Sequence, residues 1–333
     1  MSFTLRPLSV GEQIDRAASL WRANVGLLFR LFLGFELAQF TIIKVWSELS
    51  LRWFPLAAGG VRFTEALKSA PEEVFRQLGG MMATGGVAFM VAFLGSSFAG
   101  VAAAHLLMPV AMGKAAPTLA EGLGRAWQRR GVVLSTYALS FGAGLLATVV
   151  SLLPGAAVSL LGVLADSGAA SVALVVLGTL LAMLGALLAV LWWILRVAVI
   201  SQVVAVEDLG AWASFKRAGT LVAGRVEPGL GGLLKLRLAG LITVVGLILL
   251  VVSWVLGLPA LGIQVYYGHI FDPAHADPAA IPQLLLVPAQ LLQVIAQTAV
   301  APLFPVATTL HYLDVRVRRE ALDLVPQAPP GAS

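Results

Sequence analysis

The sequence predicts an all-α fold: a polytopic membrane helix bundle of six transmembrane helices, with amphipathic helices lying along the cytoplasmic surface. Three observations lead to this prediction. Of the 333 residues 59% are hydrophobic and only 12% are charged, whereas about a quarter of an average soluble domain is charged. The hydrophobic residues gather in six runs long enough to cross a hydrocarbon core of roughly 30 Å. The basic residues fall in short clusters between these runs.

Composition also excludes several classes of function. The net charge of +5 and the pI near 9.9 could attract nucleic acid, but clusters between apolar runs are typical of membrane topology signals, so we expect no nucleic-acid partner. Cysteine is absent, which removes disulfides, thiolate nucleophiles and Cys-ligated metals. The first residues have no apolar core followed by a small-residue cleavage site. We therefore expect no cleaved signal peptide.

The first predicted element is a cytoplasmic amphipathic helix in residues 1–23. Ser9 and Glu12 have the capping-box spacing, in which both side chains bind free amides of the first helical turn. Apolar residues then recur at helical spacing from Ile14 to Trp21. This helix leads into the first hydrophobic run.

The membrane domain is expected to cover residues 24–320, and the Pro-, Gly- and Ala-rich tail 321–333 has no reason to fold. Pro154 interrupts the third run, whose far end is then expected to bend along the outer surface, and Pro259 stops the fifth. The fourth run is longer than a bilayer requires, so it either tilts strongly or projects into the cytoplasm. A short helix is expected around Phe63–Leu78. The six spans are placed at about 24–47, 81–112, 131–164, 169–206, 238–258 and 283–313.

Two further amphipathic helices are predicted between spans. Thr118 and Glu121 form a second capping box ahead of an apolar face. The basic stretch 203–237 lies between two apolar runs and is interpreted as an interfacial hinge, in which Asp208 caps a helix. The apolar side of that helix is predicted to consist of Trp212, Phe215, Gly219 and Val222, and Leu221 departs from the pattern.

Lys and Arg residues orient the chain. Fifteen of the twenty-two lie in the N-terminus, the 2–3 loop, the 4–5 hinge and the C-terminus, whereas four lie on the opposite side, all in the first loop. Because positive charge is retained in the cytoplasm, both termini are expected there. The basic residues expected at the membrane surface are Arg16, Arg125, Arg129, Arg130, Lys216, Arg217 and Arg225.

An Arg-Ala pair recurs in each amphipathic segment, as Arg16-Ala17, Arg125-Ala126 and Arg217-Ala218. A proline also follows or interrupts each odd-numbered run, at Pro55, Pro154 and Pro259. One interpretation is an internal repeat. The other is chance similarity among amphipathic helices, because the tryptophans do not align.

Some polar residues fall inside predicted spans. Glu36 and Arg196 are each placed about 15–18 Å from the inner boundary, so a mid-membrane ion pair is predicted, either as a structural lock or as part of a solute, ion or proton pathway. His105 is interpreted as a hydrogen-bonded packing residue. Three glutamines share one face of the sixth span and either bond to neighbouring helices or line a polar cavity: Gln290, Gln293 and Gln297.

No cofactor or metal is expected. The loop containing His269, Asp272, His275 and Asp277 has metal-compatible side chains, but their spacing matches no standard site and prolines surround them. A solvated loop is the preferred interpretation. The glycines at Gly229–Gly232 follow no predicted strand, and no nucleophile elbow is present, so the sequence predicts neither a dinucleotide site nor a hydrolase.

The segments Leu8–Phe29, Val203–Arg225 and His311–Glu320 resemble the recurring elements of a large bacterial family. Its members are six-helix membrane proteins related to the membrane domain of some glycerophosphodiester phosphodiesterases. The resemblance implies a protein of the bacterial plasma membrane. No hydrophilic stretch is long enough to form the catalytic barrel of the fused members, so no catalytic residue is carried over.

Two functions from different classes fit the sequence. The first is a non-enzymatic membrane scaffold or assembly partner, which would use its basic amphipathic helices to bind anionic lipid or an unidentified protein. The second is a transporter or lipid-handling protein with a polar site between helices 1, 4 and 6.

Overall fold

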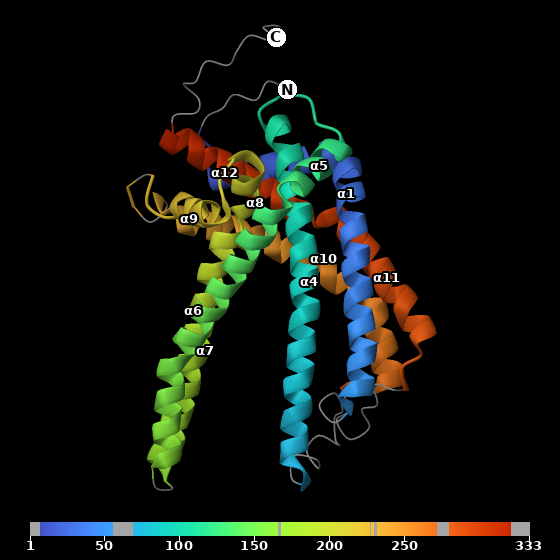
Figure 1. Ribbon diagram of the computed structural model, residues 1–333, viewed down its shortest axis with the longest axis vertical. Helices are drawn as coiled ribbons and strands as arrows, with labels where there is room; N and C mark the ends of the chain where they lie inside the picture. Colours follow the sequence, from blue (N-terminus) through green and yellow to red (C-terminus); the bar gives the residue numbers. More distant parts are fainter. Residues whose placement is uncertain are drawn as a thin grey trace. The chain divides into compact units, whose positions relative to one another are not determined.

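The computed structural model describes residues 7–55, 69–165, 168–226, 228–229, 232–271 and 280–320. The fold is all-α, as predicted, and no strand occurs in these ranges, where an isolated bridge pairs Arg225 with Leu233. Figure 1 gives the order of the helices. They are α1 (Val10–Trp53), α4 (Pro71–Ala111), α5 (Leu119–Gln128), α6 (Arg130–Leu164), α7 (Ala169–Val197), α8 (Ile200–Val206), α9 (Ala211–Val222), α10 (Leu234–Gly268), α11 (Gln283–Val300) and α12 (Leu303–Glu320).

Within the described ranges, six segments are long and apolar enough to cross a membrane. Their lengths of 35 to 44 residues exceed the roughly 20 that a bilayer requires, so each can extend beyond the hydrocarbon core. The chain is therefore a multi-pass membrane protein. The segments are Val10–Trp53, Pro71–Ala111, Arg130–Leu164, Ala169–Val206, Leu234–Gly268 and Gln283–Glu320.

The chain divides into two compact units that do not follow the linear order of the spans. The first unit comprises Met1–Gln13, Ala104–Leu241 and Thr308–Ser333, and the second comprises Ile14–Ala103 and Ile242–Ala307. The first unit therefore contains most of the segments predicted to be cytoplasmic, together with α6 and α7.

Several predicted boundaries are corrected at proline. Pro154 lies inside α6 and Pro259 inside α10, and both helices continue beyond them, to Leu164 and Gly268. A proline removes one backbone hydrogen bond, but transmembrane helices tolerate this loss where neighbouring groups compensate. The predicted interruption at Pro154 and the predicted stop at Pro259 are therefore wrong.

The starts of the first two long helices, α1 and α4, also differ from the predicted boundaries. The predicted border at residue 23 coincides with no break, because α1 runs without interruption from Val10 to Trp53. Helix α4 begins at Pro71, ahead of the predicted span 81–112. A proline in the first helical turn is favourable because its missing N–H would have no helical partner there. Residues 56–68, which include the start of the predicted helix Phe63–Leu78, and the tail 321–333 lie outside the described residues.

Two predicted spans are each divided by a turn. Pro302 follows α11, and the chain resumes as α12 at Leu303, so the predicted span 283–313 is two helices. The fourth run is divided at Ala198 and Val199 into α7 and α8. No proline or glycine marks this second break, which coincides with the onset of complete burial.

Antiparallel contacts join the helices of the second unit. In α1 and α4, Trp46 Nε1 donates to Thr84 Oγ1 at 3.3 Å, and Gln39 accepts a 2.9 Å bond from Ser96. The indole of Trp21 in α1 donates to the carbonyl oxygen of Ala299 in α11 at 2.9 Å. Along α1, the later residue Trp46 contacts the earlier residue of α4 and Gln39 the later one, and the early residue Trp21 contacts the end of α11, as antiparallel packing requires.

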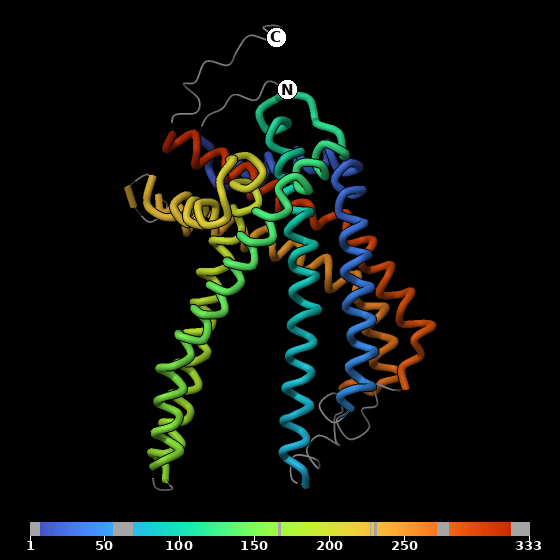
Figure 2. Tube along the Cα trace, in the orientation of Figure 1, coloured from blue at the N-terminus to red at the C-terminus, as the bar shows by residue number. Residues whose placement is uncertain are grey.

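Helices α6 and α7 form an antiparallel hairpin in the first unit, as the tube in Figure 2 shows. Small residues bring the two backbones together: a Cβ at Gly155 would lie 2.3 Å from the amide nitrogen of Ala182, and one at Gly185 would lie 2.3 Å from the carbonyl oxygen of Ser151. Close backbone approach through small residues is typical of helix pairs in membranes, where helix association lacks a hydrophobic driving force.

The exposed side of this hairpin identifies its lipid-facing length. Large apolar side chains are exposed repeatedly from Leu145 to Leu164 on α6 and from Val172 to Trp192 on α7. Twenty helical residues rise about 30 Å, the thickness of a hydrocarbon core. Arg196 follows this apolar length in the last turn of α7.

Helices α1, α5 and α9 begin at equivalent positions relative to their Arg-Ala pairs. The capping residues are Ser9, Thr118 and Gly210, and in each case the arginine follows seven residues later. Both predicted capping boxes are present, because Ser9 and Thr118 exchange bonds with Glu12 and Glu121. The three alanines are all buried. This shared register favours the internal repeat.

Candidate functional site

A buried core in the first unit supports the candidate site. Ala198–Ala205 and Thr308–Val315 are buried throughout. Gln202 joins the two segments, because its Nε2 donates to Thr308 Oγ1 at 2.9 Å and to Thr309 Oγ1 at 3.3 Å. Since buried polar groups are costly unless they are hydrogen-bonded, these bonds specify how α8 packs against α12.

Asp314 joins the start of α1 to α10 and α12. Its carboxylate is fully buried and accepts a 2.7 Å bond from the backbone N–H of Leu8. Arg318 approaches it at 3.0 Å and Arg237 at 3.5 Å, and both arginines also donate to the carbonyl oxygen of Leu8. The charges in this cluster are thus paired and hydrogen-bonded, as a buried position requires.

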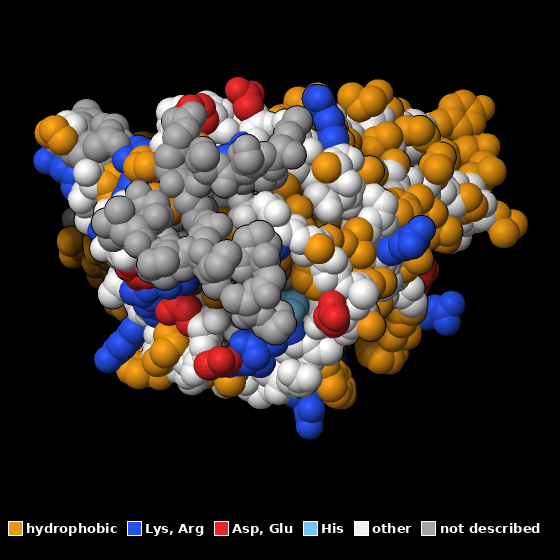
Figure 3. All heavy atoms as spheres, turned by 90° about the horizontal axis from the view of Figure 1, so that it is seen from above, with side chains coloured by type: hydrophobic (Ala, Val, Ile, Leu, Met, Phe, Trp, Pro, Cys, Tyr) orange, Lys and Arg blue, Asp and Glu red, His pale blue; other side chains and the backbone are white. Residues whose placement is uncertain are grey.

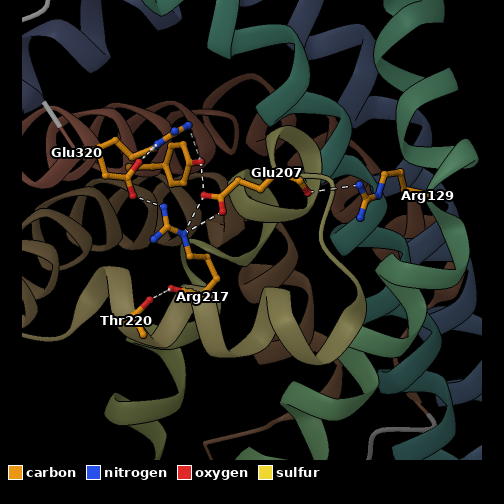
Figure 4. Close-up of polar contacts among 7 residues, drawn as sticks. Arg129, Glu207, Arg217, Thr220 and Glu320 are labelled. Atoms are coloured by element: carbon orange, nitrogen blue, oxygen red, sulfur yellow. Dashed lines mark hydrogen bonds and ion pairs between the residues drawn. The ribbon is translucent and has the colours of Figure 1, made fainter. Parts of the chain in front are cut away.

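A second cluster, centred on Glu207, is shown in Figure 4. Its carboxylate accepts a 2.9 Å bond from Arg217 Nε on α9 and a 2.8 Å bond from the hydroxyl of Tyr312 on α12. Arg217 also pairs with Glu320, which accepts a 2.7 Å bond from Arg316. The cluster therefore holds α9 against the end of α12.

Asp208 does not cap α9, which corrects the sequence prediction. Gly210 is the N-cap residue, and no side chain caps this helix. The Asp208 carboxylate instead bonds to Arg125 and Arg129, each at 2.6 Å. The hydrogen bond and charge of Arg125 lower the pKa of the Asp208 carboxyl below its usual range, and Arg129 contributes a smaller effect in the same direction. The two ion pairs therefore stabilise the fold at neutral pH, and their contribution is lost as pH falls through the lowered pKa.

The buried face of α9 also differs from the predicted one. It consists of Ser214, Phe215, Ala218, Leu221 and Val222. Leu221 therefore belongs to the packed side, whereas Trp212 is exposed. Helix α9 therefore packs against the core with Ala218 and Leu221, and Trp212 lies on its exposed side.

A pocket of about 560 Å³ lies between the end of α7, helix α9 and the start of α10. Three of its lining residues are basic: Arg196, Lys216 and Lys235. Most of the others are apolar or small, namely Trp192, Leu195, Gly219, Val222 and Ala223, and Thr220 completes the lining. No acidic residue is among the described residues that line this pocket. The combination of three cations and apolar walls is suited to an anionic amphiphile.

Arg196 is held over aromatic rings in this pocket. Its guanidinium lies 4.0 Å from the centroid of Phe215 and 5.4 Å from that of Trp192. Its Nη2 donates to the carbonyl oxygen of Phe215 at 3.3 Å, and its Nε is buried without a hydrogen-bond partner. Gly219 makes room for the guanidinium, because a Cβ there would lie 2.6 Å from Nη2.

The predicted pairing of Arg196 with Glu36 stays a prediction. Glu36 is half-buried on α1 in the second unit, whereas Arg196 belongs to the first. Arg196 lies in the last turn of α7, inside the apolar segment Ala169–Val206.

The other intramembrane candidates lie apart from the pocket residues in sequence. Gln293 donates to the carbonyl oxygen of Ser253 on α10 at 3.4 Å, and Gln290 has a buried Oε1 without a hydrogen-bond partner. Gln297 is half-buried on the same helix. His105 is half-buried near the end of α4.

The predicted surface residues have different environments. Arg125, Arg129 and Arg217 are engaged by carboxylates, as described above. Arg130 lies over the ring of Trp127 and Lys216 over that of Trp212, each 5.1 Å from the centroid. Arg16 is half-buried, and Arg225 is exposed. On the face shown in Figure 3, basic and acidic side chains lie next to one another.

The loop considered for metal binding falls largely outside the described residues. Asp272, His275 and Asp277 belong to this part, and His269 precedes it. Among the residues that the structure does describe, no group of three or more His, Asp or Glu side chains could hold a metal ion.

Sequence reasoning missed Asp314, Glu207 and Lys235 as site residues. A signal was present for Asp314, since Arg318 follows it at the i+4 spacing that pairs charges on a helix. No local signal joins Lys235 to Arg196, because the pocket depends on how α9 folds back between them.

No family model matches the chain, and no curated protein or solved structure matches it.

Proposed function

We propose that this protein is a non-enzymatic scaffold of the bacterial plasma membrane, with both termini in the cytoplasm and with anionic lipid bound along that face. One observation supports the proposal above all. Helices α5 and α9 each bury an alanine against the protein and expose a tryptophan with a cation over its ring. Exposed tryptophan beside Lys or Arg is typical of residues at the headgroup level of a membrane.

Ion pairs to the folded core hold α5 and α9 in place. Arg125 and Arg129 on and after α5 bind Asp208, and Arg217 on α9 binds Glu207. Arg125, Arg129 and Arg217 are thus paired with carboxylates of the protein. Arg130 and Lys216 are the cations that we assign to lipid phosphates. An assembly partner that binds the same surface fits this arrangement as well.

Spin labels on single cysteines test the proposal, because the chain contains no native cysteine. Ala213 is exposed on α9, and Ala115 is exposed in the loop before α5. In liposomes, a label at Ala213 is expected at headgroup depth and deeper in phosphatidylglycerol than in phosphatidylcholine, whereas a label at Ala115 remains in water. Equal water accessibility at the two positions would refute the interfacial role.

A lipid-handling protein is the second candidate, and the basic pocket favours it. A transport pathway between the first, fourth and sixth membrane spans remains a prediction, since these spans contain residues of both units.

A further inference from the structure

Among the described residues, the cations of the pocket lack the acidic partners that the neighbouring arginines have. Within the described part of the first unit, Asp208, Glu207, Glu320 and Asp314 pair with the surrounding arginines. No carboxylate there pairs with Arg196, Lys216 or Lys235. Three cations that face one pocket repel one another, so an anion bound among them would offset that repulsion.

The position of Arg196 is suited to a phosphate group. Packing of its guanidinium on Phe215 limits the rotamers that it can adopt. A guanidinium that is already oriented loses less conformational entropy when it binds an anion, and its planar donors match phosphate oxygens. Lys235 adds charge from the first turn of α10, where the helix dipole also favours an anion.

The walls of the pocket favour a lipid over a free anion. Trp192, Leu195 and Val222 present apolar surface beside the cations. The lipid-facing series of α7 leads to the pocket. Leu188 is exposed about one helical turn before Trp192, and Leu191 is exposed shortly before Arg196. Acyl chains lying along this surface would place their headgroup among the three cations.

We infer that this pocket binds the phosphate group of one anionic glycerophospholipid, with the acyl chains along α7. The inference rests on the proposed function for the location of the pocket at the membrane surface, and it adds the class of ligand. A volume of about 560 Å³ is within the usual range for a small-molecule site, and it accommodates a phosphate with its glycerol.

Native mass spectrometry of the full-length protein in detergent tests the inference, with phosphatidylglycerol and phosphatidylcholine added in equal amounts. The wild type is expected to retain phosphatidylglycerol preferentially. The double variant Lys216→Gln, Lys235→Gln is expected to bind the first phosphatidylglycerol about thirtyfold more weakly. This follows because each lysine near an anionic headgroup contributes about 1 kcal/mol, and about 1.4 kcal/mol is a factor of ten.

A matched control has the same change in net charge. Lys114 and Arg22 are exposed and do not line the pocket. The double variant Lys114→Gln, Arg22→Gln should bind the first phosphatidylglycerol as the wild type does. An equal loss in the control and the pocket variant would show attraction by overall charge and would overturn the site.

Gly219→Leu tests the shape of the pocket with every charge retained. Its Cβ would displace the guanidinium of Arg196, and leucine has a higher helix propensity than glycine, so α9 itself should not be weakened. Phosphatidylglycerol binding should fall at least tenfold while the thermal midpoint is maintained. Unchanged binding in both Gly219→Leu and the pocket double variant would refute the inference.

Inorganic phosphate distinguishes the two sources of the same chemistry. It is expected to compete weakly, because it lacks acyl chains, and competition at the affinity of phosphatidylglycerol would overturn the lipid assignment. The detergent measurement does not depend on α9 lying on a bilayer. Failure of the spin-label test would therefore remove the scaffold proposal and leave this binding result standing, and the reverse also holds.

Discussion

At the scale of single residues, burial separates carboxylates that otherwise make similar contacts. Asp314 and Asp208 each interact with two arginines, but the Asp314 side chain is fully buried and that of Asp208 is 78% exposed. Surface ion pairs contribute little because water screens them, whereas removing one member of a buried cluster leaves an unpaired charge.

Asp314→Asn is therefore expected to destabilise the protein by about 3–5 kcal/mol, since it removes a buried negative charge that pairs with both Arg237 and Arg318. Thermal unfolding of the purified protein in detergent measures the effect. Asp208→Asn is the matched control and should lower the midpoint much less. Equal losses in the two variants would show that burial does not determine the role of Asp314.

Local sequence determined some residue roles and not others. The alanine of each Arg-Ala pair lies in a predicted amphipathic segment, and all three alanines are buried. Asp208 was interpreted as a cap because it precedes α9. Arg125 and Arg129, which lie about 80 residues earlier in the chain, bind its carboxylate instead, and no local pattern contains such a long-range contact.

At the scale of elements, helix starts were predictable and several helix breaks were not. A capping box satisfies its amides within four residues, so Ser9 and Thr118 mark their helices by local chemistry alone. The turn between α7 and α8 has no such signal, because it lies where the helix changes from an exposed to a buried environment. Pro154 and Pro259 did not end their helices, because the surroundings of each helix compensate for the backbone hydrogen bond that a proline removes.

Packing between α6 and α7 leads to a prediction at Gly178. A Cβ there would lie 2.4 Å from the amide nitrogen of Ser159 and 2.6 Å from the carbonyl oxygen of Gly155, so a backbone would have to move. Gly178→Ala should destabilise the protein by about 1–3 kcal/mol. Thermal unfolding in detergent measures the loss.

Gly142 provides the control for this substitution. It lies in α6, and a Cβ added there would have no other atom within 4 Å. Gly142→Ala should therefore leave the midpoint unchanged or raise it, since alanine has the higher helix propensity. A lower midpoint for Gly142→Ala than for Gly178→Ala would contradict the packing argument.

At the scale of the whole molecule, the described ends of the chain meet. The bond from Leu8 to Asp314 joins the start of α1 to α12, which is consistent with an even number of crossings. The first unit also brings together α5, α9 and the end of α12, which are separated in sequence and were all predicted to lie on one side. The number of apolar segments was readable from hydropathy, but their grouping was not, because it depends on pairing between distant residues such as Gln202 and Thr308.

The orientation of the molecule gives the last prediction. Fifteen of the twenty-two Lys and Arg residues lie in the segments assigned to the cytoplasm, and the short connection between α6 and α7 contains none. Because Lys and Arg are retained in the cytoplasm, Gln128 at the end of α5 should face inward and Ala165 at the far end of α6 outward. An impermeant thiol reagent applied to intact cells should therefore label Ala165→Cys and leave Gln128→Cys unlabelled until the membrane is opened. Labelling in the reverse order would invert the topology, and it would place the basic pocket on the outer membrane face.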